Sequence, residues 1–391
     1  MGNFGADGIV GPHAEKEGSY YTIKEVWCPV QLTWNDVEKG ELTLSNQYNF
    51  VNLKDCRFSY RLLQMPAMGS TQVKVLKQGN LSSPDVAPGK EAQVKIPMMA
   101  NADAVEIKAV NHEGEEIMTW SRGVKSEERR VKNSSAPSTS SAAYADQADA
   151  VEVKAGGRTY RFAKKDGRLM GVEVGSKAIS LSNGPRFMAA RRSDRSLDQF
   201  YNHDDKEAEK KKTLYTEFVD QGAFAGFEWK EAEAKLVATY QHGSLDEVDW
   251  QFLSDGSVAV TCHYNFGGVV DMMGMAFDYP ESKVRSKAWV GNGPYRVWQN
   301  REQGPQYGYW QNDYNDPIPA ESWDYPEFKG YFANVKWMQF KTDEGKIGFS
   351  GLTADEHMGV YTPRDGRDGL LYTLPQTGLA VFKVIPSVRN K

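Results

Sequence analysis

Residues Trp289–Phe332 read WVGNGPYRVWQNREQGPQYGYWQNDYNDPIPAESWDYPEFKGYF, and this stretch organises the rest of the chain. It holds four tryptophans among amides, carboxylates and two arginines. Flat aromatic faces cover the apolar C–H side of a sugar, while neighbouring polar tips bond its hydroxyls. Aromatic residues are also common in the core of a β-sandwich, and on chemistry alone a core is the more frequent explanation. Both interpretations stay open at this point.

Short strands with alternating polarity fill the chain on either side. From Glu41, segments such as LTLSNQYNFVNL and CRFSYRLLQ recur about every ten residues, which predicts an immunoglobulin-like β-sandwich over residues 33–123. A stretch rich in charge, then in Ser, Ala and Pro, predicts a linker over 124–147. Strand and hairpin signals then continue over 148–391 and predict a second, larger antiparallel sandwich. The predicted fold class is therefore all-β.

The first 32 residues do not look like the start of a domain. A glycine-rich beginning is followed by YYTIKEVWCPV, which is amphipathic and stops at Pro29. This pattern predicts a loop, a short helix and an extended exit into the sandwich.

Composition narrows the classes of partner. The 391 residues carry a net charge of −5, which argues against nucleic acid as a main partner. No apolar run approaches the roughly 20 residues that cross a bilayer, so we expect no membrane partner. The N-terminus has no signal-peptide pattern, and the compartment is left open. Three widely separated cysteines, one of them Cys262, predict buried thiols rather than a disulfide framework.

The order of residues in the tryptophan-rich stretch resembles a known family. Trp289, then Gly-Asn-Gly-Pro, Trp298, Asn300-Arg301 and finally Tyr-Pro-Glu stand as in the C-terminal domain of family 2 glycoside hydrolases of the β-galactosidase type. The resemblance implies that the second sandwich is a supersandwich related to galactose mutarotase. It also implies carbohydrate-binding residues in this stretch, for which the candidates are Trp298, Asn300, Arg301, Trp310, Asp313, Trp323 and Glu327.

The resemblance extends to the N-terminus. Asp7-Gly8-Ile9-Val10 is similar to the loop that closes the catalytic (β/α)8 barrel in these enzymes, so residues 1–32 are expected to be the tail of a truncated barrel. Phe4 and Asp7 fall at positions that help to bind an alkali cation beside the sugar, a role that needs the missing barrel. We expect no cofactor in this chain alone, and an alkali or divalent cation in the complete enzyme.

Three functional hypotheses follow. The family's two catalytic carboxylates lie upstream of the exit loop, so the first is a non-catalytic C-terminal part or small subunit that completes the sugar site of a barrel, either with a catalytic chain or as a homo-oligomer. The second is a stand-alone carbohydrate-binding protein. The third is an aldose 1-epimerase, for which His263 and His357 are the candidate acids. The resemblance does not identify the sugar.

Overall fold

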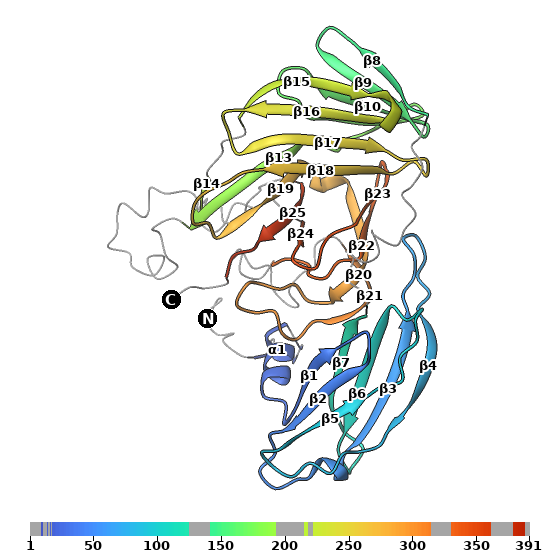
Figure 1. Ribbon diagram of the computed structural model, residues 1–391, viewed down its shortest axis with the longest axis vertical. Coiled ribbons are helices and arrows are strands. Elements are labelled where there is room, and N and C mark those ends of the chain that lie inside the picture. Colours follow the sequence, from blue (N-terminus) through green and yellow to red (C-terminus); the bar gives the residue numbers. More distant parts are fainter. Residues whose placement is uncertain are drawn as a thin grey trace, which may run out of the picture.

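The computed structural model describes residues 9–10, 14, 16, 18–124, 141–192, 215–217, 222–313, 330–360 and 378–387. Nearly all regular structure is antiparallel β-sheet, which confirms the predicted all-β class (Figure 1). The one α-helix in these ranges is α1 (Gly18–Val26). Single 3-10 turns occur at Leu53–Asp55, Glu231–Glu233 and Glu281–Lys283. No helix in the described ranges has the length and apolar character needed to cross a bilayer.

The first sandwich consists of two facing sheets. One sheet joins β1 (Val30–Asp36), β2 (Glu41–Asn46) and β5 (Glu91–Lys95). The other has the order β4-β3-β6-β7, formed by β3 (Arg57–Gln64), β4 (Lys74–Leu81), β6 (Ala104–Val110) and β7 (Glu116–Gly123).

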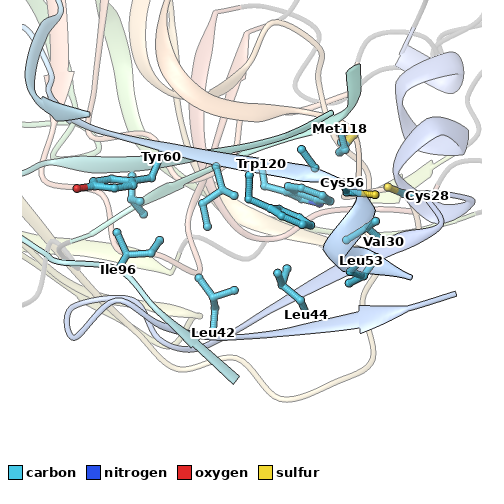
Figure 2. Packing of buried hydrophobic residues seen from close by; sticks show 14 of the residues in the cluster. Cys28, Val30, Leu42, Leu44, Leu53, Cys56, Tyr60, Ile96, Met118 and Trp120 are labelled. Carbon is cyan, nitrogen blue, oxygen red and sulfur yellow. The ribbon is translucent and has the colours of Figure 1, made fainter. Parts of the chain in front are cut away.

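Alternating side chains of these strands fill the first core. In β2 the side chains of Leu42 and Leu44 are buried, as period-2 patterning requires, and they face Trp120 from the opposite sheet (Figure 2). Asn46 is also fully buried, and its Nδ2 donates to the carbonyls of Val51 and Val86, both at 2.8 Å. This satisfied amide fixes the loop that follows β2, because a buried polar group without partners would be costly.

Two strands reach outside the limits predicted for their sandwiches. Val30 is fully buried and opens β1, so the sandwich begins three residues before the predicted residue 33. The predicted linker ends too late, because Ala143–Asp146 form β8 and pair with β9. Residues 125–140 lie outside the described residues.

The larger region begins with a ten-stranded sheet. Its path runs β24-β25-β19-β13-β11-β10-β9-β8, with β12 pairing β11 and β14 pairing β13. Besides β8, its members are β9 (Ala150–Ala155), β10 (Arg158–Ala163), β11 (Leu169–Val174), β12 (Lys177–Ile179), β13 (Ser182–Arg192), β14 (Tyr215–Glu217), β19 (Met272–Asp278), β24 (His357–Val360) and β25 (Leu379–Val384).

The remaining described strands form two further four-stranded sheets. The first, in the order β15-β16-β17-β18, consists of β15 (Ala223–Lys230), β16 (Lys235–Gln241), β17 (Leu245–Phe252) and β18 (Val258–Tyr264). It packs on the ten-stranded sheet through a core that includes Phe162, Phe187 and Trp250. The second, in the order β21-β20-β22-β23, consists of β20 (Val284–Gly293), β21 (Gln306–Asp313), β22 (Trp337–Thr342) and β23 (Gly345–Ser350).

The second four-stranded sheet joins the two regions. It lies between the first sandwich and the rest of the molecule (Figure 1). Val290 and Trp337 on its near face form a small apolar core with Leu63, Met65 and Ala104 of the sandwich. Its far face, with Trp289 and Phe340, belongs to a separate core shared with β24 and β25. This sheet therefore fixes the sandwich against the tryptophan-rich stretch.

Candidate functional site

The connection between β20 and β21, residues 294–305, carries the centre of the tryptophan-rich motif, and we call it the tryptophan loop. Backbone bonds tie it to a distant segment: Val297 and Tyr331 exchange N–H···O bonds of 2.8 and 2.9 Å. At the C-terminal side, the Gln299 amide donates to the Pro386 carbonyl at 3.1 Å. The loop is thus held on two sides by backbone that comes later in the chain.

Trp298 is a core residue in this arrangement. Its side chain is only 4% exposed and meets the Tyr331 ring edge-on, with centroids 5.5 Å apart. Its Nε1 lies so close to Gly330 that a Cβ added to that glycine would stand 3.0 Å away. The predicted role of this ring in covering a sugar stays a prediction, and a ring this buried offers little surface to a ligand.

Trp310 and the Gly-Asn-Gly-Pro motif also serve packing. The Trp310 Nε1 donates to the carbonyls of Gly291 at 3.1 Å and Gln306 at 3.2 Å, and the ring is half-buried. A Cβ on Gly293 would stand 2.6 Å from this ring, so glycine is required there. Trp289 is fully buried and donates to the Asn292 carbonyl at 2.9 Å. The motif therefore closes the β20–β21 hairpin around its tryptophans, and the sugar-facing role of Trp310 stays a prediction.

Two of the predicted polar residues remain accessible at the tip of the loop. Asn300 is exposed and Arg301 is half-buried. The Arg301 guanidinium donates to the Ser19 hydroxyl of α1 at 3.4 Å. Asp313 ends β21 opposite Ser286, and its side chain is not described. Trp323, Glu327, Phe4 and Asp7 lie outside the described residues, so their predicted roles stay predictions.

Helix α1 docks on the tryptophan loop. The Thr22 hydroxyl donates to the Gln303 carbonyl at 2.9 Å across a separation of 281 residues. Tyr21 stacks on Tyr295, with ring centroids 5.0 Å apart and planes 28° from parallel. Sequence reasoning placed a helix here but missed this contact, for which the only signal was the pair of tyrosines on an amphipathic segment. The segment predicted to leave a barrel therefore touches the loop predicted to complete a sugar site.

A half-buried carboxylate holds the same contact. The Gly304 amide donates to the Glu25 Oε2 at 2.6 Å. Burial raises the pKa of Glu25, and the Gly304 hydrogen bond only partly opposes this rise. Gly304 has φ +102°, and a Cβ there would stand 2.8 Å from the Thr22 backbone nitrogen. Glycine is therefore needed both for the conformation and for the approach of the helix.

A lysine is buried beside Trp289 and Phe332, and the sequence alone did not single it out. Lys287 is 1% exposed, with its Nζ 5.9 Å from the Trp289 ring centroid and 5.5 Å from that of Phe332. The Arg296 guanidinium also lies over Phe332, at 5.0 Å. A lysine at a core-facing position of an alternating strand is the signal that could have revealed this site. Cationic groups over aromatic faces gain electrostatic stabilisation in an apolar setting.

The two histidines considered for epimerase chemistry have different surroundings. His357, at the start of β24, shares a sheet face with Phe382, and burial lowers its pKa. Its Nδ1 is buried without a hydrogen-bond partner among the described residues. His263 is exposed on β18, where its neighbours Cys262 and Tyr264 turn toward the core. Burial also raises the pKa of the Cys262 thiol to about 12, as expected for a structural cysteine.

Comparison with known protein families shows to which family the chain belongs. The family model described as "Beta galactosidase small chain" matches residues 154–365, which is more than half of the chain. The chain belongs to the β-galactosidase small-chain family. A second model, "Beta-galactosidase, domain 4", matches residues 42–120, within the first sandwich.

Solved structures show a more distant likeness. The exo-chitosanase CsxA of Amycolatopsis orientalis aligns at a TM-score of 0.23 and 12% identity, over 48% of this chain and 22% of that one. A variant of that enzyme in complex with PNP-beta-D-glucosamine aligns equally, over 47% and 22%. This chain thus matches less than a quarter of the length of these proteins. No curated protein sequence matches the chain.

Proposed function

We propose that this chain is a non-catalytic part of a β-galactosidase-type glycoside hydrolase, and that it supports and completes the sugar site of a catalytic (β/α)8 barrel. The barrel is supplied by another chain or by further sequence. The observation that carries the proposal is the docking of α1 on the tryptophan loop, through Thr22 and Glu25. Membership of the small-chain family supports the same role.

In this proposal α1 sets the position of the loop relative to the barrel. Val26 and Trp27 are 54% and 74% exposed at the end of the helix, although they follow a face that packs on the loop. Two adjacent exposed apolar side chains provide an anchor for the outer helices of a barrel. The loop on one side and the barrel on the other would then fix the helix, and the helix would in turn fix the loop.

The loop tip supplies the polar contacts. Asn300 carries one acceptor and two donors, and Arg301 carries five donors, which suits the hydroxyls of a sugar. The Ser19 hydroxyl orients the Arg301 guanidinium. The buried tryptophans hold the loop in place, while the barrel contributes the carboxylate pair of the reaction.

Sedimentation velocity tests the association directly. The chain is mixed with a β-galactosidase catalytic chain that ends at its barrel, and a complex is expected. Trp27→Glu should weaken the complex at least tenfold, since it places a charge in a desolvated contact. Val269→Glu is the matched control, because Val269 is 83% exposed and far from α1 in the sequence. An equal effect of both variants, or no complex at all, would refute the proposed interface.

The alternative of a stand-alone carbohydrate-binding protein makes a different prediction. Isothermal titration of galactose and lactose into the isolated chain should give no heat of specific binding under our proposal. Saturable binding that disappears in Asn300→Ala would favour the alternative.

A further inference from the structure

The outer face of the β15–β18 sheet carries a second cluster of functional groups. Glu247 and Asp249 stand two residues apart on β17, so they project from the same face. His263 on β18 is the direct cross-strand partner of Glu247. The intervening Val248 is buried and faces the core, which places the three polar residues on the opposite side of the sheet.

The spacing of these groups is close to that of metal ligands. One ligand atom from each of the three residues lies within 4.8 Å of those from the others, and this is the only such group among the described residues. Two ligands bonded at about 2.1 Å to one ion are at most about 4.2 Å apart. Because His263 is exposed, rotation of its side chain can close the remaining gap.

One carboxylate oxygen in the cluster has no hydrogen-bond partner. The Lys235 Nζ donates to Asp249 Oδ2 at 3.3 Å and also pairs with Glu233 at 2.9 Å. Asp249 Oδ1 is buried and has no partner among the described residues. The lysine therefore orients the carboxylate while one oxygen is left to bind another donor or a cation. A buried carboxylate oxygen without a partner calls for such an explanation.

We propose that Glu247, Asp249 and His263 bind a first-row divalent transition-metal cation of the Zn²⁺ type. Imidazole is a ligand that Zn²⁺ prefers and that Mg²⁺ and Ca²⁺ disfavour. Two carboxylates add negative charge that offsets the cation, while Glu233 pairs with the nearby Lys235. Three protein ligands leave a further coordination position for water.

A cation bound at this site would link the edge strand β18 to its inner neighbour β17. β18 is the last strand in the order β15-β16-β17-β18, so among the described strands it has a neighbour on one side only. A cation shared between β17 and β18 would hold this edge strand in register. The site lies on a different sheet from β20 and β21, which flank the tryptophan loop, and this proposal does not rest on the proposed function.

Isothermal titration of ZnCl2 into the metal-free full chain, at pH 7 in a non-chelating buffer, tests the site. We expect one saturable event and a rise in the thermal midpoint. His263→Gln and Asp249→Asn should each reduce Zn²⁺ affinity at least tenfold. His112→Gln is the matched control: His112 is another exposed histidine beside a carboxylate, 3.8 Å from Glu113, and its loss should leave affinity unchanged.

Cobalt substitution gives a readout that does not depend on stability. Co²⁺ bound by these ligands should give visible d–d bands that are absent in His263→Gln. Far-ultraviolet circular dichroism establishes that each variant is folded, and His263→Gln alone decides the test if Asp249→Asn unfolds. No saturable Zn²⁺ binding, unchanged binding in His263→Gln, or displacement of Zn²⁺ by an equal concentration of Mg²⁺ would overturn the proposal.

Discussion

Two of the long-range contacts in this chain differ in their chemistry. Between the first sandwich and the sheet of β20–β23, Leu63, Met65 and Trp337 form an apolar core. Hydrogen bonds such as that from the Ser121 amide to Gln306 Oε1, at 2.6 Å, join the same two parts. The Trp337 Nε1 donates to the Pro66 carbonyl at 2.9 Å, so its one polar atom is satisfied. Between α1 and the tryptophan loop, by contrast, hydrogen bonds and a single tyrosine stack form the contact, and Trp27 remains exposed beside it.

This difference indicates which surface is complete within the chain. The sandwich contact buries its aromatic anchor fully and needs no further partner. The α1 contact leaves two large apolar side chains in solvent and gains little apolar burial of its own. The first contact therefore sets the architecture, and the second is the surface on which a catalytic barrel would dock under the proposed function.

The largest expected effect lies at the sandwich contact. Trp337→Ala should lower the free energy of unfolding by about 3–5 kcal/mol, because it opens a cavity and leaves the Pro66 carbonyl without its donor. Trp27→Ala should change stability by less than about 0.5 kcal/mol, since that ring is exposed. Guanidinium denaturation followed by fluorescence measures both. Equal losses would abolish the distinction between the two contacts.

A partly buried carboxylate on the β22–β23 turn, Glu344, gives the next effect. Burial raises the pKa of Glu344, but hydrogen bonds from Lys283, Ser180 and Tyr279 outweigh this and lower the pKa to about 2. Its stabilisation should be present above the unfolded value of 4.5 and lost as the pH falls toward 2. Glu344→Gln should cost on the order of 2–3 kcal/mol at pH 7 and flatten stability between pH 4.5 and pH 2. Urea titrations at several pH values measure the free energy of unfolding of both proteins. A loss of stability between pH 4.5 and pH 2 that is as steep in Glu344→Gln as in the wild type would contradict the prediction.

At the α1 contact a backbone change should act locally. Gly304→Ala forces a strained φ and brings a Cβ against the Thr22 backbone, so α1 should loosen by roughly 1–2 kcal/mol. Hydrogen exchange of the helix amides should accelerate about tenfold, while the amides of β3 stay protected. Gly89→Ala is a control for the φ effect alone, because Gly89 has φ +72° with open space around it. Faster exchange throughout the chain would show that α1 is part of the global folding unit.

The smallest effect concerns the pH dependence of the same contact. The pKa of Glu25 is raised, so its contribution should be fully present below the unfolded value of 4.5 and lost as the pH rises through the raised folded value. Glu25→Gln should keep the bond from Gly304 and remove this dependence, with a change below about 1 kcal/mol at pH 7. Helix-amide exchange between pH 4 and pH 7 gives the comparison. A wild-type contact that tightens with rising pH would reverse the sign.

The sequence was informative where local patterns determine structure. Alternation in the segment containing Leu42 and Leu44 predicted β2 and its buried face, and the ordered motif around Trp289 indicated the family. The linker was extended too far because Ala143–Asp146 is an edge strand with few apolar residues. The role of Trp298 depends on a backbone pairing with the Tyr331 segment, and the docking of α1 depends on residues about 280 positions away. Neither long-range contact leaves a periodic signal in the sequence.

Under the proposed function, this chain completes a catalytic barrel without supplying the catalytic carboxylates. The most direct measurement is hydrolysis of an aryl β-galactoside by three samples: this chain, a β-galactosidase catalytic chain ending at its barrel, and their mixture. We predict no turnover by this chain, little by the barrel alone, and restored turnover in the mixture that falls at least tenfold with Trp27→Glu but not with Val269→Glu. Turnover by the repurified chain alone, or a mixture no more active than the barrel, would contradict the account.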